Sequence, residues 1–209
     1  MAAPLNAPAH PTTLPINIKP SGVRKHGFPS NVPNLATHSE VLVSDFPRRY
    51  TKHQDLGIGG EGRIELWENT TTKIRIAIKV VKQVPLPREV LILRDLPPHK
   101  SIVQFLAWFY YGPYHQYSFI LYEYCSGGDL LQLDELAWTR SKSALSEACM
   151  WAIFRQLTEA IAFLHEALGC ENPKDAENWR PIIHRDVKAQ NVSVAFTAKV
   201  YVMCMLTDF

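Results

Sequence analysis

Gly57-Ile58-Gly59-Gly60-Glu61-Gly62 and the segment that follows it, Arg63-Ile64-Glu65-Leu66-Trp67, decide the fold of this chain. Glycines permit positive φ angles and let backbone N–H groups approach phosphate oxygens without a Cβ in the way. A dinucleotide-binding fold would require a helix directly after the last glycine. Apolar and polar residues alternate there instead, which predicts a β-strand. The glycines are therefore predicted to form a hairpin lid over a nucleotide, and an ordinary glycine turn is the alternative.

The rest of the chain shows strand patterns first and a helical pattern later. Alternation over Ile74–Val80 predicts a second strand, and two more are expected over Val103–Trp108 and Phe119–Tyr122. Farther on, a helix with Ser146 as its N-cap is predicted, because apolar residues recur with helical spacing. Its apolar face comprises Leu145, Cys149, Ile153, Leu157, Ile161 and Leu164. Strands followed by helices predict an α+β fold with two lobes.

The composition is that of a globular domain without a strong electric field. The 22 Lys and Arg residues nearly balance the 20 Asp and Glu residues, so neither nucleic acid nor an anionic membrane is an expected partner. The most apolar long stretch, 148–164, is interrupted by charged residues and is not expected to cross a bilayer. The four cysteines form no CxxC pair, which favours a reducing compartment, the cytoplasm or the nucleus.

Residues 1–46 contain seven of the fifteen prolines and show no apolar periodicity. Such a segment cannot bury enough apolar surface to offset the entropy of ordering it. A disordered, proline-rich tail is therefore predicted over 1–46, and the folded domain is expected over 47–209.

Lys79 ends the apolar strand pattern Ile76-Ala77-Ile78. A lysine among such residues is costly to bury unless it meets an anion. Two anions are candidates, a nucleotide phosphate and Glu89, which opens a short helix with Pro87 at its first helical position. The alternative is a surface lysine whose stem alone is buried.

The segment His184-Arg185-Asp186-Val187-Lys188-Ala189-Gln190-Asn191, with Asp208-Phe209 after it and the glycine loop and Lys79 before it, resembles the eukaryotic protein kinase family, Ser/Thr type. The resemblance covers about residues 50–209. It implies a five-stranded antiparallel N-lobe over about 47–122, a hinge at 123–128, and a partial, mainly helical C-lobe over 129–209. The segment 125–130 and the insert that ends at 179–183 are similar to NIMA-related kinases, fungal ones in particular.

The resemblance implies a reaction in which the γ-phosphoryl group of ATP is transferred to a Ser or Thr hydroxyl of a protein substrate. Asp186 would orient that hydroxyl and accept its proton, and Lys188 would steady the phosphoryl group. Lys79, fixed by Glu89, would hold the α- and β-phosphates. The implied ligands of Mg²⁺ are Asn191 and Asp208.

The resemblance also implies which residues surround the nucleotide. The backbones of Glu123 and Cys125 would hydrogen-bond adenine, Asp129 would meet the ribose, and Tyr122 would be the gatekeeper. The glycine lid and the apolar ceiling of the site would comprise Gly57, Gly59, Gly62, Ile64 and Ala77. An apolar stack linking the two lobes would comprise Leu93, Phe105, His184 and Phe209, although each could simply belong to the core.

The chain also departs from the family pattern. Ser193 stands where an apolar residue usually lies under adenine, which could weaken stacking by roughly 1 to 2 kcal/mol. The apolar run 195–205 would have to form two buried strands, or it is foreign sequence from a misread gene. The chain stops at Phe209, so an exposed lower lobe and no turnover are expected for these residues alone. The alternatives are a non-catalytic fragment that binds nucleotide or a partner, and an incomplete gene model.

Overall fold

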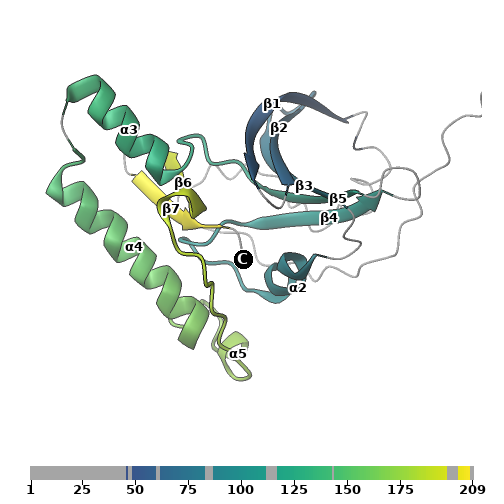
Figure 1. Cartoon of the computed structure of the whole chain (residues 1–209). Helices are drawn as coiled ribbons and strands as arrows, with labels where there is room; N and C mark the ends of the chain where they lie inside the picture. The colour runs from purple at the N-terminus through teal and green to yellow at the C-terminus, as the bar shows by residue number, and fades with distance from the viewer. Residues whose placement is uncertain are drawn as a thin grey trace, which may run out of the picture.

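A computed structural model of the chain describes residues 46, 49–59, 62–82, 87–111, 117–142, 144–196 and 202–207. An antiparallel sheet forms its upper part, with the strand order β1-β2-β3-β5-β4 (Figure 1). The five strands are β1 (Tyr50–Gly59), β2 (Gly62–Asn69), β3 (Arg75–Lys82), β4 (Phe105–Tyr111) and β5 (Tyr117–Glu123). The predicted α+β fold with a five-stranded upper lobe is confirmed.

The central strand β3 is buried on both faces, which explains its near-continuous apolar sequence. Ile76, Ile78 and Val80 point to the outer face of the sheet and join one apolar cluster. Ala77 and Val81 point to the inner face and join a second cluster. Lys79 shares that inner face because side chains alternate along a strand. The apolar pattern of β3 therefore places one lysine toward the interior of the molecule.

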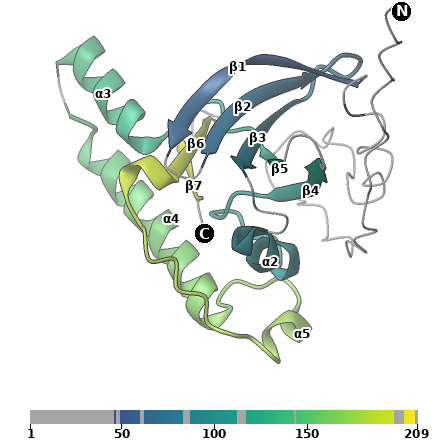
Figure 2. The ribbon, with the colours of Figure 1, turned by 45° about the vertical axis from the view of Figure 1, so that its right-hand side comes forward.

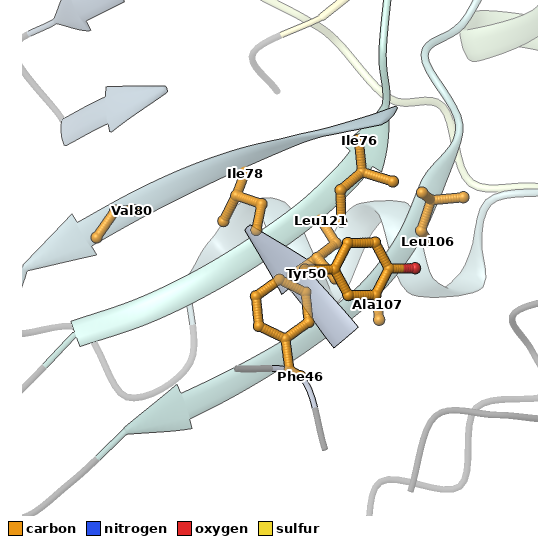
Figure 3. Close-up of a cluster of buried hydrophobic side chains, with 8 residues drawn as sticks. All are labelled: Phe46, Tyr50, Ile76, Ile78, Val80, Leu106, Ala107 and Leu121. Carbon is orange, nitrogen blue, oxygen red and sulfur yellow. The ribbon is translucent and has the colours of Figure 1, made fainter. Parts of the chain in front are cut away.

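Aromatic rings cover the outer face of the sheet (Figure 3). Phe46 is only 5% exposed and stacks on Tyr50, with ring centroids 4.7 Å apart. Its ring also contacts Trp67 and Phe109. Phe46, the last residue of the predicted tail, therefore packs with the sheet of the domain expected over 47–209. Residues 1–45, predicted to be a disordered tail, lie outside the described residues.

Helix α2 (Arg88–Asp95) lies beneath the sheet and is eight residues long, little more than two turns (Figure 2). Val90 and Leu93 are buried and pack into the inner-face cluster, which also contains Phe105. Pro87 is extended and precedes the helix as its N-cap residue, so the prediction that it occupies the first helical position is wrong by one residue. This helix positions Glu89, which lies in its first turn.

The lower part of the molecule is mainly helical, and its two longer helices lie to one side of the sheet in both views (Figures 1 and 2). The elements are α3 (Leu130–Ser141), α4 (Glu147–Glu166), α5 (Pro173–Ala176), the 3₁₀ turn η2 (Ala189–Asn191), β6 (Val192–Phe196) and β7 (Val202–Leu206). The predicted cap of α4 is present, since the Ser146 side chain accepts a hydrogen bond from the backbone N–H of Cys149. Ile153 and Leu164 of the predicted apolar face are buried, and Leu145, Cys149 and Leu157 pack partly buried against the same cluster, which also contains Phe163.

The apolar run near the C-terminus forms the predicted pair of strands. β6 and β7 are antiparallel, with Val192 opposite Leu206 and Phe196 opposite Val202. Val192 and Val194 are buried, whereas Phe196 is 51% exposed, so the prediction of burial holds only for part of β6. β7 packs along α4. None of the helices within the described ranges combines the length and apolarity needed to cross a bilayer.

Candidate functional site

A cleft of about 350 Å³ lies between the sheet and the segments formed by the start of α3, η2 and β6. Its volume is within the usual range for small-molecule sites, roughly 300–1,000 Å³. Segments far apart in the chain line it, namely the glycine lid, β3, α2, the hinge and the loop 184–191, which the resemblance implies is the catalytic loop. The predicted site residues among its lining are Gly57, Ile64, Ala77, Lys79, Glu89, Tyr122, Glu123, Cys125, Asp129, Asn191 and Ser193. The fold therefore gathers most of the predicted nucleotide site around one cavity.

Several predicted residues do not line this cavity. Gly59 and Gly62 lie at the facing ends of β1 and β2. Gly62 has a positive φ, and a Cβ there would collide with the backbone carbonyl of Val80, so glycine is required by close packing against β3. Asp186 and Lys188 are exposed just outside the cleft, and Asp208 lies outside the described residues.

The buried charges of Lys79 and Glu89 meet at the back of the cleft. Lys79 Nζ lies 2.8 Å from Glu89 Oε2, and each side chain is only 7% exposed. Burial of either charge alone would cost several kcal/mol, so each residue stabilises the buried charge of the other. The alternative of a surface lysine is wrong, because the whole residue is 5% exposed. The pair leaves a cationic amine facing the space that a nucleotide would fill.

The catalytic loop is ordered by contacts among its own residues. Lys188 Nζ lies 2.7 Å from Asp186 Oδ2. The Asn191 amide nitrogen donates to both the backbone carbonyl and the Oδ2 atom of Asp186, each at 2.9 Å. Because its nitrogen is engaged in this way, the oxygen of the Asn191 amide is the atom available to a hard cation.

Thr207, the residue before Asp208, is fixed to the same loop. Its backbone N–H and its hydroxyl both donate to the carbonyl of Asn191, at 2.9 and 3.1 Å. Nε2 of His184 lies 2.6 Å from the Thr207 carbonyl, while its Nδ1 accepts from the backbone N–H of Asp186. Arg185, between them, adopts a left-handed φ of 69°, a conformation that costs energy in a non-glycine residue. The end of β7 is therefore held against the catalytic loop.

A family model for the protein kinase domain matches residues 50–209, which include the lid, the Lys79–Glu89 pair and the whole catalytic loop. The chain belongs to the protein kinase family. Similar curated proteins include C01C4.3 and zyg-1 of Caenorhabditis elegans and DDB_G0280111 of Dictyostelium discoideum, all provisionally named serine/threonine-protein kinases.

The relatives are considerably longer than this chain. C01C4.3 is 29% identical over 83% of the chain, zyg-1 is 29% identical over 77%, and the Dictyostelium protein is 32% identical over 56%. The matched parts amount to 40%, 20% and 9% of those proteins. The likeness therefore concerns the kinase domain and not the whole relatives.

The hinge of this kinase domain is tied to both lobes. The backbone N–H of Glu123 donates to the Gln104 carbonyl, and the Glu123 carboxylate accepts from the Gln104 N–H at 2.7 Å. Gly127 donates to the carbonyl of Val194, and Val194 donates to the carbonyl of Gly128, each at 2.8 Å. A Cβ on Gly127 would approach the Val194 side chain and carbonyl to 2.8 Å. The close approach explains why this turn is built from glycines.

Asp129 has a structural role that the resemblance did not imply. Its carboxylate accepts from the Gln132 N–H at 2.8 Å, and the Gln132 side chain accepts from the Asp129 N–H at 3.3 Å. This reciprocal capping box begins α3. An Asp followed three residues later by Gln is a recognisable signal in the sequence. Asp129 thus fixes the start of α3 at the same place where it lines the cleft.

Other cleft residues escaped the sequence prediction. They are Leu56, Ile58, Val103, Tyr124, Gln132, Gln190 and Thr207. Leu56 and Ile58 flank Gly57, and Tyr124 lies between the two predicted hinge residues. Their position next to predicted site residues could have indicated that they line the cleft. For Thr207 and Val103 there was none, because Thr207 follows β7 and Val103 precedes β4, and only the tertiary fold brings them to the cavity.

Lys188 controls the protonation of Asp186 in this geometry. The hydrogen bond from Lys188, helped by the one from Asn191, holds the pKa of Asp186 below its ordinary value. Asp186 therefore stays ionised at neutral pH and becomes protonated only as the pH falls through that lowered pKa.

In a Lys188→Met variant we expect the pKa of Asp186 to rise toward its ordinary value, since the largest stabilising contact of the carboxylate is lost. The measurement is a pH titration of the Asp186 carboxyl carbon by NMR, with Lys174→Met as the control. An unchanged titration midpoint in Lys188→Met would contradict the assigned contact.

Proposed function

We propose that this kinase domain binds Mg²⁺ and ATP in the cleft and transfers the γ-phosphoryl group to Ser or Thr hydroxyls of protein substrates. One observation carries the proposal: Lys79, paired with Glu89, and Asn191, bonded to Asp186, line or adjoin the same cavity. Phosphoryl transfer needs charge neutralisation and alignment more than it needs covalent help. These residues supply both.

The residues divide the chemistry between them. Lys79 binds α- and β-phosphate oxygens, held in place by its buried partner Glu89. Asp186, ionised at neutral pH, orients the substrate hydroxyl and accepts its proton, while Lys188 offers positive charge to the phosphoryl group. Asn191 and Asp208 are the proposed oxygen ligands of Mg²⁺, which when bound neutralises charge on the phosphate oxygens.

The apolar part of the cleft suits a purine. Ile64 and Ala77 form its ceiling, and the backbone of Glu123 and Cys125 offers hydrogen-bonding groups at its edge. Ser/Thr specificity is supported by Lys188 two residues after Asp186 and by the names of the relatives. Membership of the NIMA-related group and location in the cytoplasm or nucleus stay predictions.

Nucleotide binding is tested by thermal unfolding of the purified chain. A ligand that binds only the folded state at about 100 times its Kd stabilises that state by roughly 2.7 kcal/mol. We expect millimolar ATP with Mg²⁺ to raise the Tm, and Mg²⁺ alone, or ATP with a chelator, to have a smaller effect. Transfer of labelled phosphate to a generic protein substrate tests the reaction itself. No rise in Tm with Mg-ATP would rule out the proposed function.

A second candidate is nucleotide binding without turnover by these 209 residues. It is favoured by large apolar side chains that are exposed on α3 and α4, namely Trp138 (58%), Trp151 (63%) and Phe154 (62%). Exposed apolar surface of this kind favours association of the chain with other copies or with a partner protein. An associated chain would still offer the nucleotide cleft but need not catalyse transfer. Stabilisation by Mg-ATP with no labelled product would support this second candidate, and labelled product that depends on Asp186 would exclude it.

A substitution at Ser193 is predicted to strengthen nucleotide binding. It lines the cleft from β6, at a position where the resemblance implies an apolar residue. We expect Ser193→Leu to tighten Mg-ATP binding roughly tenfold, because the added side chain would bury apolar area against the purine. Isothermal titration calorimetry measures the change, and Ser193→Ala, which removes the hydroxyl without filling the space, should have a much smaller effect. Weaker binding by Ser193→Leu would show that the purine does not lie over β6.

A further inference from the structure

Glu65 is a buried carboxylate in the middle of β2 that the proposed reaction does not use. Its side chain is only 3% exposed, and it lies next to Ile64, which lines the cleft. A carboxylate at this degree of burial is unstable unless donors surround it. The residues that donate hydrogen bonds to Glu65 therefore indicate its structural role.

Three donors from both strands of the lid converge on Glu65. Lys52 of β1 donates to Oε1 at 2.9 Å, and Arg63 of β2 donates to the same oxygen. The indole N–H of Trp67 donates to Oε2 at 2.8 Å. Lys52 also lies 2.7 Å from Asp55, so that the ion pairs extend along β1. Glu65 thus joins the two strands of the lid on the face opposite the cleft.

The protonation state supports this arrangement. Burial on its own would raise the pKa of Glu65, but hydrogen bonds from Arg63, Lys52 and Trp67 outweigh it, and the pKa lies below its ordinary value. The carboxylate is therefore charged at neutral pH and holds its three donors.

β1 needs such a contact because its own sequence specifies its register weakly. Residues 51–55 are polar and exposed, so no apolar alternation fixes their pairing with β2. The pairing also contains two irregularities, one between Lys52 and Gln54 and one between Asp55 and Gly57. At each, β1 has one residue more than β2, as in a β-bulge. A strand of this kind could pair in more than one register.

The second bulge determines which β1 side chains face the cleft. Asp55 pairs with Glu65 and Gly57 pairs with Ile64, so Leu56 is the extra residue between them. Leu56, Gly57 and Ile64 all line the cavity. A shift of one residue would exchange the faces of β1 and would turn Leu56 away from the cavity. The contacts of Glu65 lie directly beside this bulge and favour the register observed.

We propose that Glu65 is a positioning residue that fixes the register of the β1–β2 lid and thereby sets the affinity for the nucleotide. The inference rests on the proposed function, since it concerns how the same cleft holds ATP. Glu65 does not touch the cavity and acts through Leu56, Gly57 and Ile64.

The test compares Glu65→Gln with Glu68→Gln in the full chain. Glu68 is a matched control, because it lies on the same strand and pairs with Arg75 and Lys73, and its contact with β1, to His53, lies at the first bulge, away from the cleft. We expect the Kd for Mg-ATP, measured calorimetrically at a temperature where all variants are folded, to rise about tenfold in Glu65→Gln and to stay nearly unchanged in Glu68→Gln. Equal affinities in Glu65→Gln and the unmodified chain would overturn the inference.

A second pair of variants covers the case in which Glu65→Gln does not fold. Lys52→Met removes one donor from the exposed side and should also weaken Mg-ATP binding, whereas Lys52→Arg keeps a donor and should restore it. Hydrogen exchange without nucleotide should be faster over residues 50–59 in Lys52→Met and should match the unmodified chain in Lys52→Arg.

The outcomes separate this inference from the proposed function. If the unmodified chain does not bind Mg-ATP, both the proposed function and the effect on affinity fail. If it binds, and Lys52→Met leaves the Kd and the exchange of β1 unchanged, the role of Glu65 alone is wrong.

Discussion

Replacing Lys79 by Met is expected to abolish stabilisation by Mg-ATP and to lower the stability of the free domain. The amine that meets the phosphates is lost, and Glu89 is left buried without its partner. Removing one member of a buried ion pair costs roughly 3–5 kcal/mol, which corresponds to a fall in Tm of roughly 10 °C for a domain of this size. Thermal unfolding with and without Mg-ATP measures both effects in one experiment.

A double variant separates the two roles of Lys79. Replacing both members of a buried ion pair by apolar residues is often neutral, so Lys79→Met combined with Glu89→Leu should recover much of the stability. It should not recover the response to Mg-ATP. Lys82→Met, an exposed lysine on the same strand, is the control and should behave like the unmodified chain. A double variant that still responds to Mg-ATP would show that Lys79 does not bind phosphate.

Asp186→Asn is expected to reduce phosphoryl transfer about 10²- to 10⁴-fold, the usual contribution of a positioned proton acceptor. The amide keeps the size of the carboxylate but cannot accept the proton of the hydroxyl. Because Asp186 lies outside the lining of the cavity, the Kd for Mg-ATP should change little. Measurement of the rate of transfer and of Mg-ATP affinity on the same preparation tests the separation.

Asp134→Asn is the matched control for this variant, since Asp134 is an exposed carboxylate on α3, outside the lining of the cleft. Transfer that continues at the normal rate in Asp186→Asn would remove Asp186 from the mechanism. A large loss of Mg-ATP affinity in the same variant would instead indicate that Asp186 helps to order Asn191, to which it is hydrogen-bonded.

The fold was predictable where apolar residues repeat and obscure where they do not. The alternation along β3 and the helical period of α4 reflect burial of one or both faces, so the sequence records them directly. β1 carries the polar run 51–55 and is held mainly by pairing with β2, which leaves little local signal. Phe46 was assigned to the tail because it is an isolated aromatic residue next to a proline-rich segment. Its local sequence gives no indication that it packs against the sheet.

The site was predictable to the extent that its residues belong to short motifs. Lys79, Asp186 and Asn191 stand at fixed places in such motifs, and the structure brings Lys79 and Asn191 to one cavity. Glu65 and Thr207 belong to no motif, and the contacts of Glu65 with Lys52 and of Thr207 with Asn191 join residues that are distant in sequence. Asp208, the second proposed ligand of Mg²⁺, lies outside the described residues, so its role stays a prediction.

The hydrogen bonds that join Gly127 and Gly128 to Val194 have a mechanical consequence. They connect the end of the hinge to β6, the strand from which Ser193 lines the cleft. The floor of the cavity must therefore move together with the end of the hinge. Opening and closing of the cleft then requires a rotation centred on residues before Gly127, in which the lid moves relative to β6.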